Sequence, residues 1–141
     1  MIDVTEAIRT YMLLQAGIVA QVGTNVFGYQ VPPNKVASMP TKCVCIMADS
    51  GPQIPLVPVL QWRVIFRCYG AEPGFVEAWE VARAVFDLFR RGGDEIIPVT
   101  GGNVYFYRSD CENAGYIVRE PEVDWPRVDI AFSFVFSENV I

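Results

Sequence analysis

The alternation of apolar and small side chains near the C-terminus constrains the fold more than any other part of the chain. Five apolar residues occupy every second position of the segment from Arg127 to Ser137: Val128, Ile130, Phe132, Phe134 and Phe136. Successive side chains of a strand point to opposite faces of a sheet. The segment therefore predicts a strand that packs one face on a hydrophobic core.

The opposite face of this predicted strand is small and nearly uncharged. It carries Ala131, Ser133 and Val135 between Asp129 and Ser137. A strand face in contact with water usually carries charged or polar side chains, so a face this bare is expected to be covered. The cover is either another subunit, which makes Ala131, Ser133 and Val135 interface residues, or a helix of the same chain. The sequence leaves both open.

The composition is that of a single domain spanning residues 1–141. Hydrophobic residues make up 52% of the chain, slightly above the roughly 45–50% of soluble domains. A small domain has limited interior for this surplus, which favours burial on oligomerisation. No apolar run approaches the roughly 18 residues of a membrane span. The first residues, Met1-Ile-Asp-Val-Thr-Glu, lack the basic and apolar segments of a secretory signal, so we expect a cytoplasmic protein.

Helix and strand signals follow the order helix, strands, helix, strands. The first helix is predicted from about residue 4 to 22, between an Asp3 cap and a stop at Gly23. The second follows Pro73, and its predicted buried stripe is Trp79, Ala82, Val85, Phe86 and Phe89. A short extended piece is predicted over 25–29, and strands are predicted over 42–48, 59–69, 95–99, 104–108, 116–119 and 127–136. This order predicts an α+β fold, a mainly antiparallel sheet of about four to six strands packed with two helices.

The residues that carry most enzymatic chemistry are missing or badly placed. The chain contains no histidine, which removes His-based triads, His metal sites and the commonest proton shuttle. Cys43, Cys45 and Cys68 fall on predicted core strands, whereas Cys111 falls in a predicted turn over residues 110–113. Cys111 is thus the one thiol that an enzyme of this sequence would use. We predict no catalytic residue, no metal site and no cofactor.

Two further segments are candidates for partner contacts. Ile54, Leu56 and Val57 lie in a loop stiffened by prolines, and a rigid apolar loop loses little entropy on docking. The alternative is that these side chains fold back onto the domain's own core. Arg63 and Arg67 share the polar face of the 59–69 strand, where they bind phosphate or carboxylate groups or are simply solvated.

Several short segments together resemble the small tail-completion or tail-terminator proteins of long-tailed bacteriophages. They are Ala7-Ile8 and Tyr11-Met12-Leu13 in the opening helix, the turn Val22-Gly-Thr-Asn-Val-Phe, Met39-Pro40 before a strand, and the closing Asp124-Trp-Pro-Arg-Val-Asp-Ile. The resemblance spans nearly the whole chain. It implies a structural virion protein that assembles into a hexameric ring, caps the tail tube, ends tail polymerisation and provides the docking surface for head-completion proteins.

The resemblance also implies the partners and the location. These are further copies of the chain, the tail tube protein and a head-completion or stopper protein, in the tail or neck of a virion assembled in the host cytoplasm, with no membrane. A net charge of −5 fits DNA that passes through the ring without specific binding. The alternatives are another head–tail connector component, including those of tail-like particles and gene-transfer agents, and a small non-enzymatic α+β binding or adaptor module.

Overall fold

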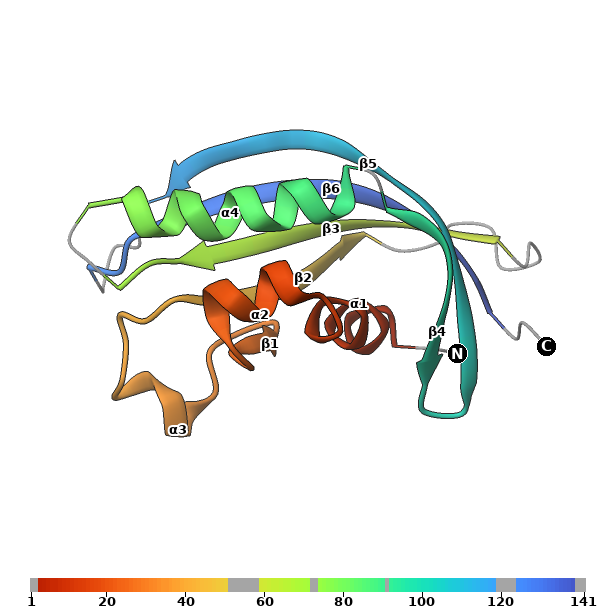
Figure 1. The fold of residues 1–141 in the computed structure, drawn as a ribbon, viewed down its shortest axis with the longest axis horizontal. Helices are drawn as coiled ribbons and strands as arrows, with labels where there is room; N and C mark the ends of the chain where they lie inside the picture. Colours follow the sequence, from red (N-terminus) through yellow and green to blue (C-terminus); the bar gives the residue numbers. More distant parts are fainter. Residues whose placement is uncertain (1–2, 51–58, 72–73, 91, 119–123, 139–141) are drawn as a thin grey trace.

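A mixed six-stranded sheet forms the frame of the molecule (Figure 1). The computed structural model describes residues 3–50, 59–71, 74–90, 92–118 and 124–138. The strands run in the order β1-β2-β3-β6-β5-β4. They are β1 (Val26–Gly28), β2 (Cys43–Ser50), β3 (Val59–Tyr69), β4 (Gly93–Val99), β5 (Gly102–Val118) and β6 (Arg127–Glu138). β1 and β2 are parallel and all other neighbours are antiparallel, which confirms the expected α+β class.

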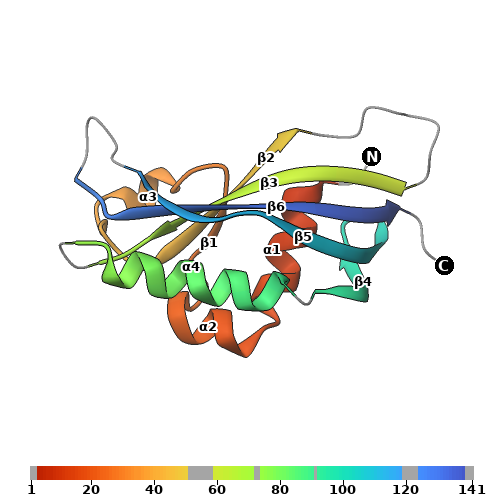
Figure 2. The ribbon, with the colours of Figure 1, turned by 90° about the horizontal axis from the view of Figure 1, so that it is seen from above.

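The longer helices lie on one face of this sheet. The four helices of the described residues are α1 (Val4–Leu13), α2 (Ala16–Val22), α3 (Pro33–Val36) and α4 (Val76–Phe89). Figure 2 shows α4 running alongside β3, β6 and β5, with α2 beyond it. α1 contacts β1, β2 and β4. The fold is therefore two layers, a sheet and a helical layer, with one face of β3 and β6 left without a long helix among the described residues.

Phenylalanine rings fill the space between α4 and the sheet. Phe134 of β6 meets Phe89 of α4 edge-on, with ring centroids 5.0 Å apart and an interplanar angle of 87°. Phe66 of β3 stacks on the same Phe89 ring at 5.3 Å. Aromatic pairs of this kind contribute about 0.5–1.5 kcal/mol each beyond their buried area. Val128, Ile130, Phe132, Phe134 and Phe136 are all buried, so the predicted core face of this strand is confirmed.

The first helix is broken in two, and the prediction of one helix over 4–22 is wrong. Asp3 caps α1 through a hydrogen bond from the Thr5 amide at 2.9 Å, as expected, but α1 ends at Leu13. Leu14 is 71% exposed, and Gln15 has extended angles, φ −99° and ψ 121°. The break changes the direction of the chain, so α1 contacts the sheet while α2 packs on α4. Tertiary packing overrides local helix preference here.

The two short strands predicted over 104–108 and 116–119 are one strand, β5, of 17 residues. The predicted turn at residues 110–113 lies inside it. Register shifts against β6 occur after Phe106, Cys111 and Asn113. Such bulges accommodate extra residues and bend the strand without ending it, which is why a polar run that resembles a turn stays in the ladder.

The prediction that Trp79 belongs to the buried stripe of the second helix, α4, is wrong. Trp79 is 39% exposed, whereas the stripe consists of Ala78, Val81, Ala82, Val85 and Phe89. Its ring lies over Gly115, where a Cβ atom would come within 2.6 Å of the Trp79 ring. Trp79 thus packs along β5, at the edge of the sheet.

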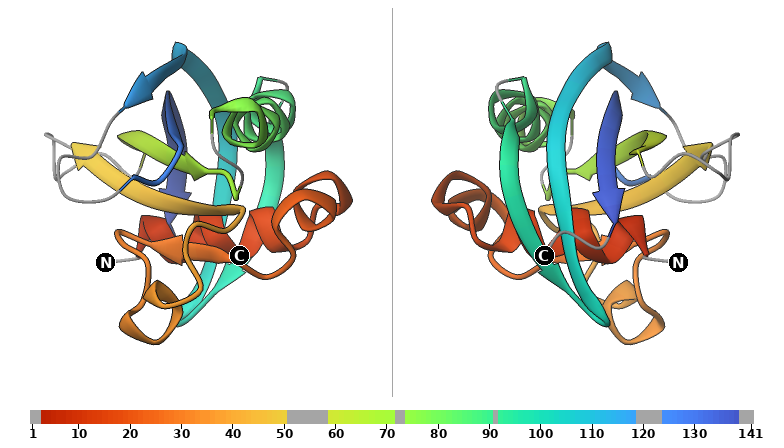
Figure 3. Two further views of the ribbon diagram at one scale, coloured as in Figure 1. Left: turned by 90° about the vertical axis from the view of Figure 1, so that its left-hand side faces the viewer. Right: turned by 90° about the vertical axis from the view of Figure 1, so that its right-hand side faces the viewer.

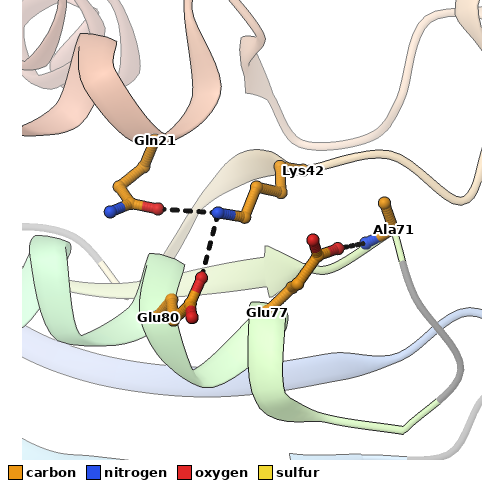
Figure 4. A network of polar contacts seen from close by, with 5 residues as sticks. All are labelled: Gln21, Lys42, Ala71, Glu77 and Glu80. Carbon is orange, nitrogen blue, oxygen red and sulfur yellow. Dashed lines mark hydrogen bonds and ion pairs between the residues drawn. The ribbon is translucent and has the colours of Figure 1, made fainter.

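A lysine fastens the helices to the start of β2 (Figure 4). Lys42 Nζ donates to Gln21 Oε1 on α2 at 2.8 Å and to Glu80 Oε2 on α4 at 3.1 Å. One turn before Glu80, Glu77 accepts a hydrogen bond from the Ala71 amide at 2.7 Å. The ends of α2, α4, β2 and β3 are therefore tied together at one end of the molecule.

Candidate functional site

The face of β3, β5 and β6 that points away from α4 is the outer face of the sheet. Its side chains are Gln61, Arg63, Ile65, Arg67, Tyr105, Arg108, Asp110, Glu112, Asn113, Tyr116, Val118, Arg127, Asp129, Ala131, Ser133, Val135 and Ser137. Five predicted interface residues lie on this face: Arg63, Arg67, Ala131, Ser133 and Val135. The register pairs Arg63 with Ser133 and Arg67 with Asp129. The structure therefore brings together residues that the sequence placed on separate strands, and no described helix covers them.

A carboxylate from β5 spans β6 on this face. Arg63 Nε donates to Glu112 Oε2 at 2.6 Å, and Ser133 Oγ donates to Glu112 Oε1 at 2.8 Å. The side chains of Arg63 and Glu112 are each 39% exposed. Exposed pairs contribute about 0–1 kcal/mol to stability, so this bridge fixes side-chain positions more than it holds the fold. It also means that the Arg63 guanidinium is partly satisfied within the subunit.

The centre of the outer face is apolar and recessed. Ala131 pairs in register with Ile65 and is only 1% exposed, although no described helix covers it. Its methyl group is short and lies among the longer side chains of the neighbouring strands, which shield it from water. Ile65 is partly exposed, as are Ser133 and Val135. Ala131 therefore forms a floor, and the accessible surface comes from its neighbours.

Two arginines, Arg127 and Arg67, flank this floor and differ in their hydrogen bonding. Arg127 binds Asp129 through two hydrogen bonds, from Nε at 2.9 Å and from Nη2 at 3.1 Å, and both side chains are largely buried. Arg67 is the register partner of Asp129, yet its Nε is buried and has no hydrogen-bond partner among the described residues. A buried donor without a partner costs about 1–3 kcal/mol. Arg67 is therefore the one outer-face cation with an unused buried donor.

One end of the outer face is closed by a small second core. Trp125, in the Asp124-Trp125-Pro126 segment, packs its ring edge-on against Tyr69 with centroids 6.0 Å apart. Val31, Met39 and Phe27 join them over the start of β2. A hollow beside this cluster has a volume of only about 10 Å³, room for about one water molecule. It is too small to be a ligand site.

The cysteines of the chain are poorly suited to nucleophilic chemistry. Cys43, Cys45 and Cys68 are buried, as predicted, and burial raises the pKa of the Cys68 thiol. Cys111 is exposed on β5, but partial burial raises its pKa as well. A reactive cysteine needs a lowered pKa. The described residues also contain no group of three or more Cys, Asp or Glu able to hold a metal ion.

The remaining predicted contact residues, Ile54, Leu56 and Val57, lie outside the described residues. Sequence reasoning missed Glu112, because it lay in a predicted turn. It also missed the exposed Ile96 and Tyr107, whose neighbours in sequence gave no sign that they face water. No helix in the described part of the chain has the length and apolar character of a membrane span.

Comparison with known proteins reveals a likeness of fold. No protein-family model and no curated protein matches the chain. Among solved structures, a chain described as "Virion of native gene transfer agent (GTA) particle" is similar, with a TM-score of 0.60 and 21% identity. The match covers 95% of this chain and 94% of that chain. The two chains therefore share one fold over nearly their whole lengths.

Proposed function

We propose that this protein is a structural subunit of a phage-like virion, which assembles as a ring on the end of the tail tube. The observation that carries the proposal is the outer face, a broad sheet surface with an apolar centre that no described helix covers. In a monomer such a surface is exposed, whereas in a ring it is buried between neighbours. The likeness of fold to a chain of a gene transfer agent virion supports the same class of function.

The proposed ring ends tail polymerisation and offers its upper surface to head-completion proteins. Its partners are further copies of itself, in a hexamer, together with the tail tube protein and a stopper protein. The net charge of −5 suits a channel through which DNA passes, because an acidic surface does not bind phosphates. The protein works through its surfaces, without cofactor or catalysis.

The experiment is an assembly assay on purified protein. Native mass spectrometry and light scattering measure the oligomeric state alone and with purified tail tubes, and electron microscopy measures where the protein binds and the lengths of the tubes. We expect rings at one end of each tube and tubes of limited length. A protein that stays monomeric and neither binds tube ends nor changes tube length would contradict the proposal. Binding to a portal or adaptor complex in place of tubes would instead favour another head–tail connector component.

A further inference from the structure

The β4–β5 hairpin carries a second group of exposed side chains, the hairpin patch, formed by Asp94, Ile96, Tyr105 and Tyr107. Tyr105 pairs with Ser137, so the patch lies on the same side of the sheet as the outer face, at its hairpin end. Ile96 pairs in register with Tyr105 and is 56% exposed, and Tyr107 is 43% exposed. The two tyrosine rings meet edge-on with centroids 4.6 Å apart. Tyr105 Oη donates to Asp94 Oδ1 at 3.1 Å. Aromatic and aliphatic side chains grouped in this way are typical of the energetic centre of an interface.

The hairpin patch is held rigidly. On the other face of the hairpin, Ile97, Val104 and Phe106 are buried in the main core. At its turn, Glu6 of α1 accepts hydrogen bonds from the Thr100 amide at 3.0 Å and from Thr100 Oγ1 at 2.8 Å. Because the patch is ordered before binding, little entropy is lost when it docks.

The centre of the outer face complements this patch, because both surfaces are apolar and each is edged by a charge of opposite sign. We name Ile65, Arg67 and Ala131 the outer-face centre: an apolar floor next to a guanidinium with an unused buried donor. Among described side chains the outer face carries four cations, Arg63, Arg67, Arg108 and Arg127, and three anions, Asp110, Glu112 and Asp129. It thus has one cation in excess on a chain whose net charge is −5. An apolar patch edged by a carboxylate fits such a surface.

The two surfaces of one copy do not meet each other. They share no residue and lie apart along the strands, because Tyr105 pairs with Ser137 of β6, whereas Ile65 pairs with Ala131, six residues earlier on the same strand. Neighbouring strands of a sheet rotate by about 20–25°, and Figure 3 shows the β4–β5 hairpin extending away from β3 and β6. When two different, complementary surfaces of one copy cannot meet each other, they bind the surfaces of neighbouring copies in a head-to-tail contact. Such a contact generates a ring when the rotation from one subunit to the next closes.

We propose that the hairpin patch of one copy docks on the outer-face centre of the next, with the Asp94 carboxylate against Arg67 and with Ile96 and Tyr107 against Ile65 and Ala131. This inference rests on the ring function proposed above and specifies its subunit contact. The occupant of the outer face is thus a second copy of this chain, and each copy contributes one surface of each kind.

The test exchanges the charges of the proposed pair. Arg67→Glu and Asp94→Lys each place like charges in every contact. We therefore expect the dissociation constant for subunit assembly to rise by at least about tenfold in each variant. The double variant restores an opposite pair and is expected to assemble again. Arg83→Glu on α4, an exposed site away from both surfaces, is the matched control for net charge and should assemble normally. Circular dichroism and melting temperatures establish that each variant is folded.

A mixing experiment tests the head-to-tail geometry directly. In an equimolar mixture of Arg67→Glu and Asp94→Lys copies, alternating neighbours bring opposite charges together at every contact. We therefore expect mixed rings of even copy number from two variants that do not assemble alone, visible by native mass spectrometry. Ile96→Ser keeps all charges and should weaken assembly of the wild-type ring through lost apolar contact.

The outcomes separate this inference from the proposed function. If wild-type protein forms rings and both charge variants assemble equally well, the contact is wrong while the ring function stands. Folded single variants that fail to assemble and are not rescued by the double variant or by mixing also overturn the contact. If wild-type protein assembles neither alone nor on tubes, the ring function itself fails.

Discussion

Glu112 of β5 and Ser133 of β6 are joined by a hydrogen bond of 2.8 Å, although the register pairs Ser133 with Asp110. The bulge after Cys111 brings Glu112 back over β6, and the same carboxylate reaches Arg63 on β3. Three strands are thus connected at one spot on the outer face. A side chain placed at position 133 disturbs this spot without entering the core.

Ser133→Arg is expected to give a folded protein that does not assemble. The long cation displaces Glu112 from Arg63 and stands above the apolar floor, where a neighbouring subunit would dock. Ser133→Ala is the matched control, because it removes one exposed hydrogen bond, worth about 1 kcal/mol, and adds no bulk. Sedimentation with circular dichroism distinguishes loss of assembly from loss of fold. An assembling Ser133→Arg protein would show that this face is solvated in the particle.

Phe134→Asp is expected to unfold the domain. Phe134 is fully buried and contacts the rings of Phe66, Phe89 and Phe106, so the variant buries a carboxylate with no partner. Val135→Asp places the same charge one position further on, on the outer face, and should leave the fold intact. Far-ultraviolet circular dichroism of both proteins checks the contrast. Equal loss of structure in the two would contradict the assignment of faces.

Gly115→Ala is expected to destabilise the domain by about 1–3 kcal/mol. Gly115 has φ 135°, and an added methyl group meets the Trp79 ring. Chemical denaturation measures the change in unfolding free energy. Combining the change with Trp79→Ala removes the clash and should recover part of the loss, whereas no recovery would show that backbone strain alone is responsible.

Acidification is expected to loosen the β4–β5 hairpin through Glu6. Hydrogen bonds from Thr100 lower the pKa of Glu6 below its ordinary value of 4.5. Because the pKa is lowered in the folded state, the contribution of Glu6 is present above about pH 4.5 and disappears as pH falls through the folded pKa. The measurement is the melting temperature from pH 7 to pH 3 for wild type and Glu6→Gln. The two curves should converge at low pH, and parallel curves would contradict the role of Glu6.

Thiol labelling should distinguish Cys111 from the other three cysteines. Cys111 is exposed, whereas Cys43, Cys45 and Cys68 are buried. We expect one thiol of the native protein to react with an aromatic disulfide reagent and all four to react after denaturation. Since the pKa of Cys111 is raised, its reaction should be slow at neutral pH and accelerate as pH rises. Cys111→Ser should assemble normally, and fast labelling at neutral pH would instead favour a reactive thiol.

The sequence predicted the elements in which apolar residues recur at regular intervals. Apolar residues alternate along β3 and β6, and the helix stop predicted at Gly23 is confirmed by its positive φ of 61°. The break at Leu14 could not be predicted, because the residues from Val4 to Val22 keep a helical period across it. What breaks the helix is the competition between the sheet and α4 for its two halves.

The candidate site was predicted only in part for a similar reason. Arg63, Arg67, Ser133 and Val135 follow from the alternation of their own strands. Glu112 reaches them only because bulges carry β5 through a polar segment that has the composition of a turn. The unused donor of Arg67 depends on what surrounds its side chain, and no local pattern in the sequence encodes that.

The continuity of β5 has a mechanical consequence. Its first residues pair with β4 in the hairpin, and from Val104 to Val118 it also pairs with β6, including the part of the strand beside Trp79. A force applied to the hairpin therefore runs lengthwise along one uninterrupted backbone and loads many hydrogen bonds to β6 in shear, at the same time. A neighbour that grips the hairpin pulls on the body of the subunit itself.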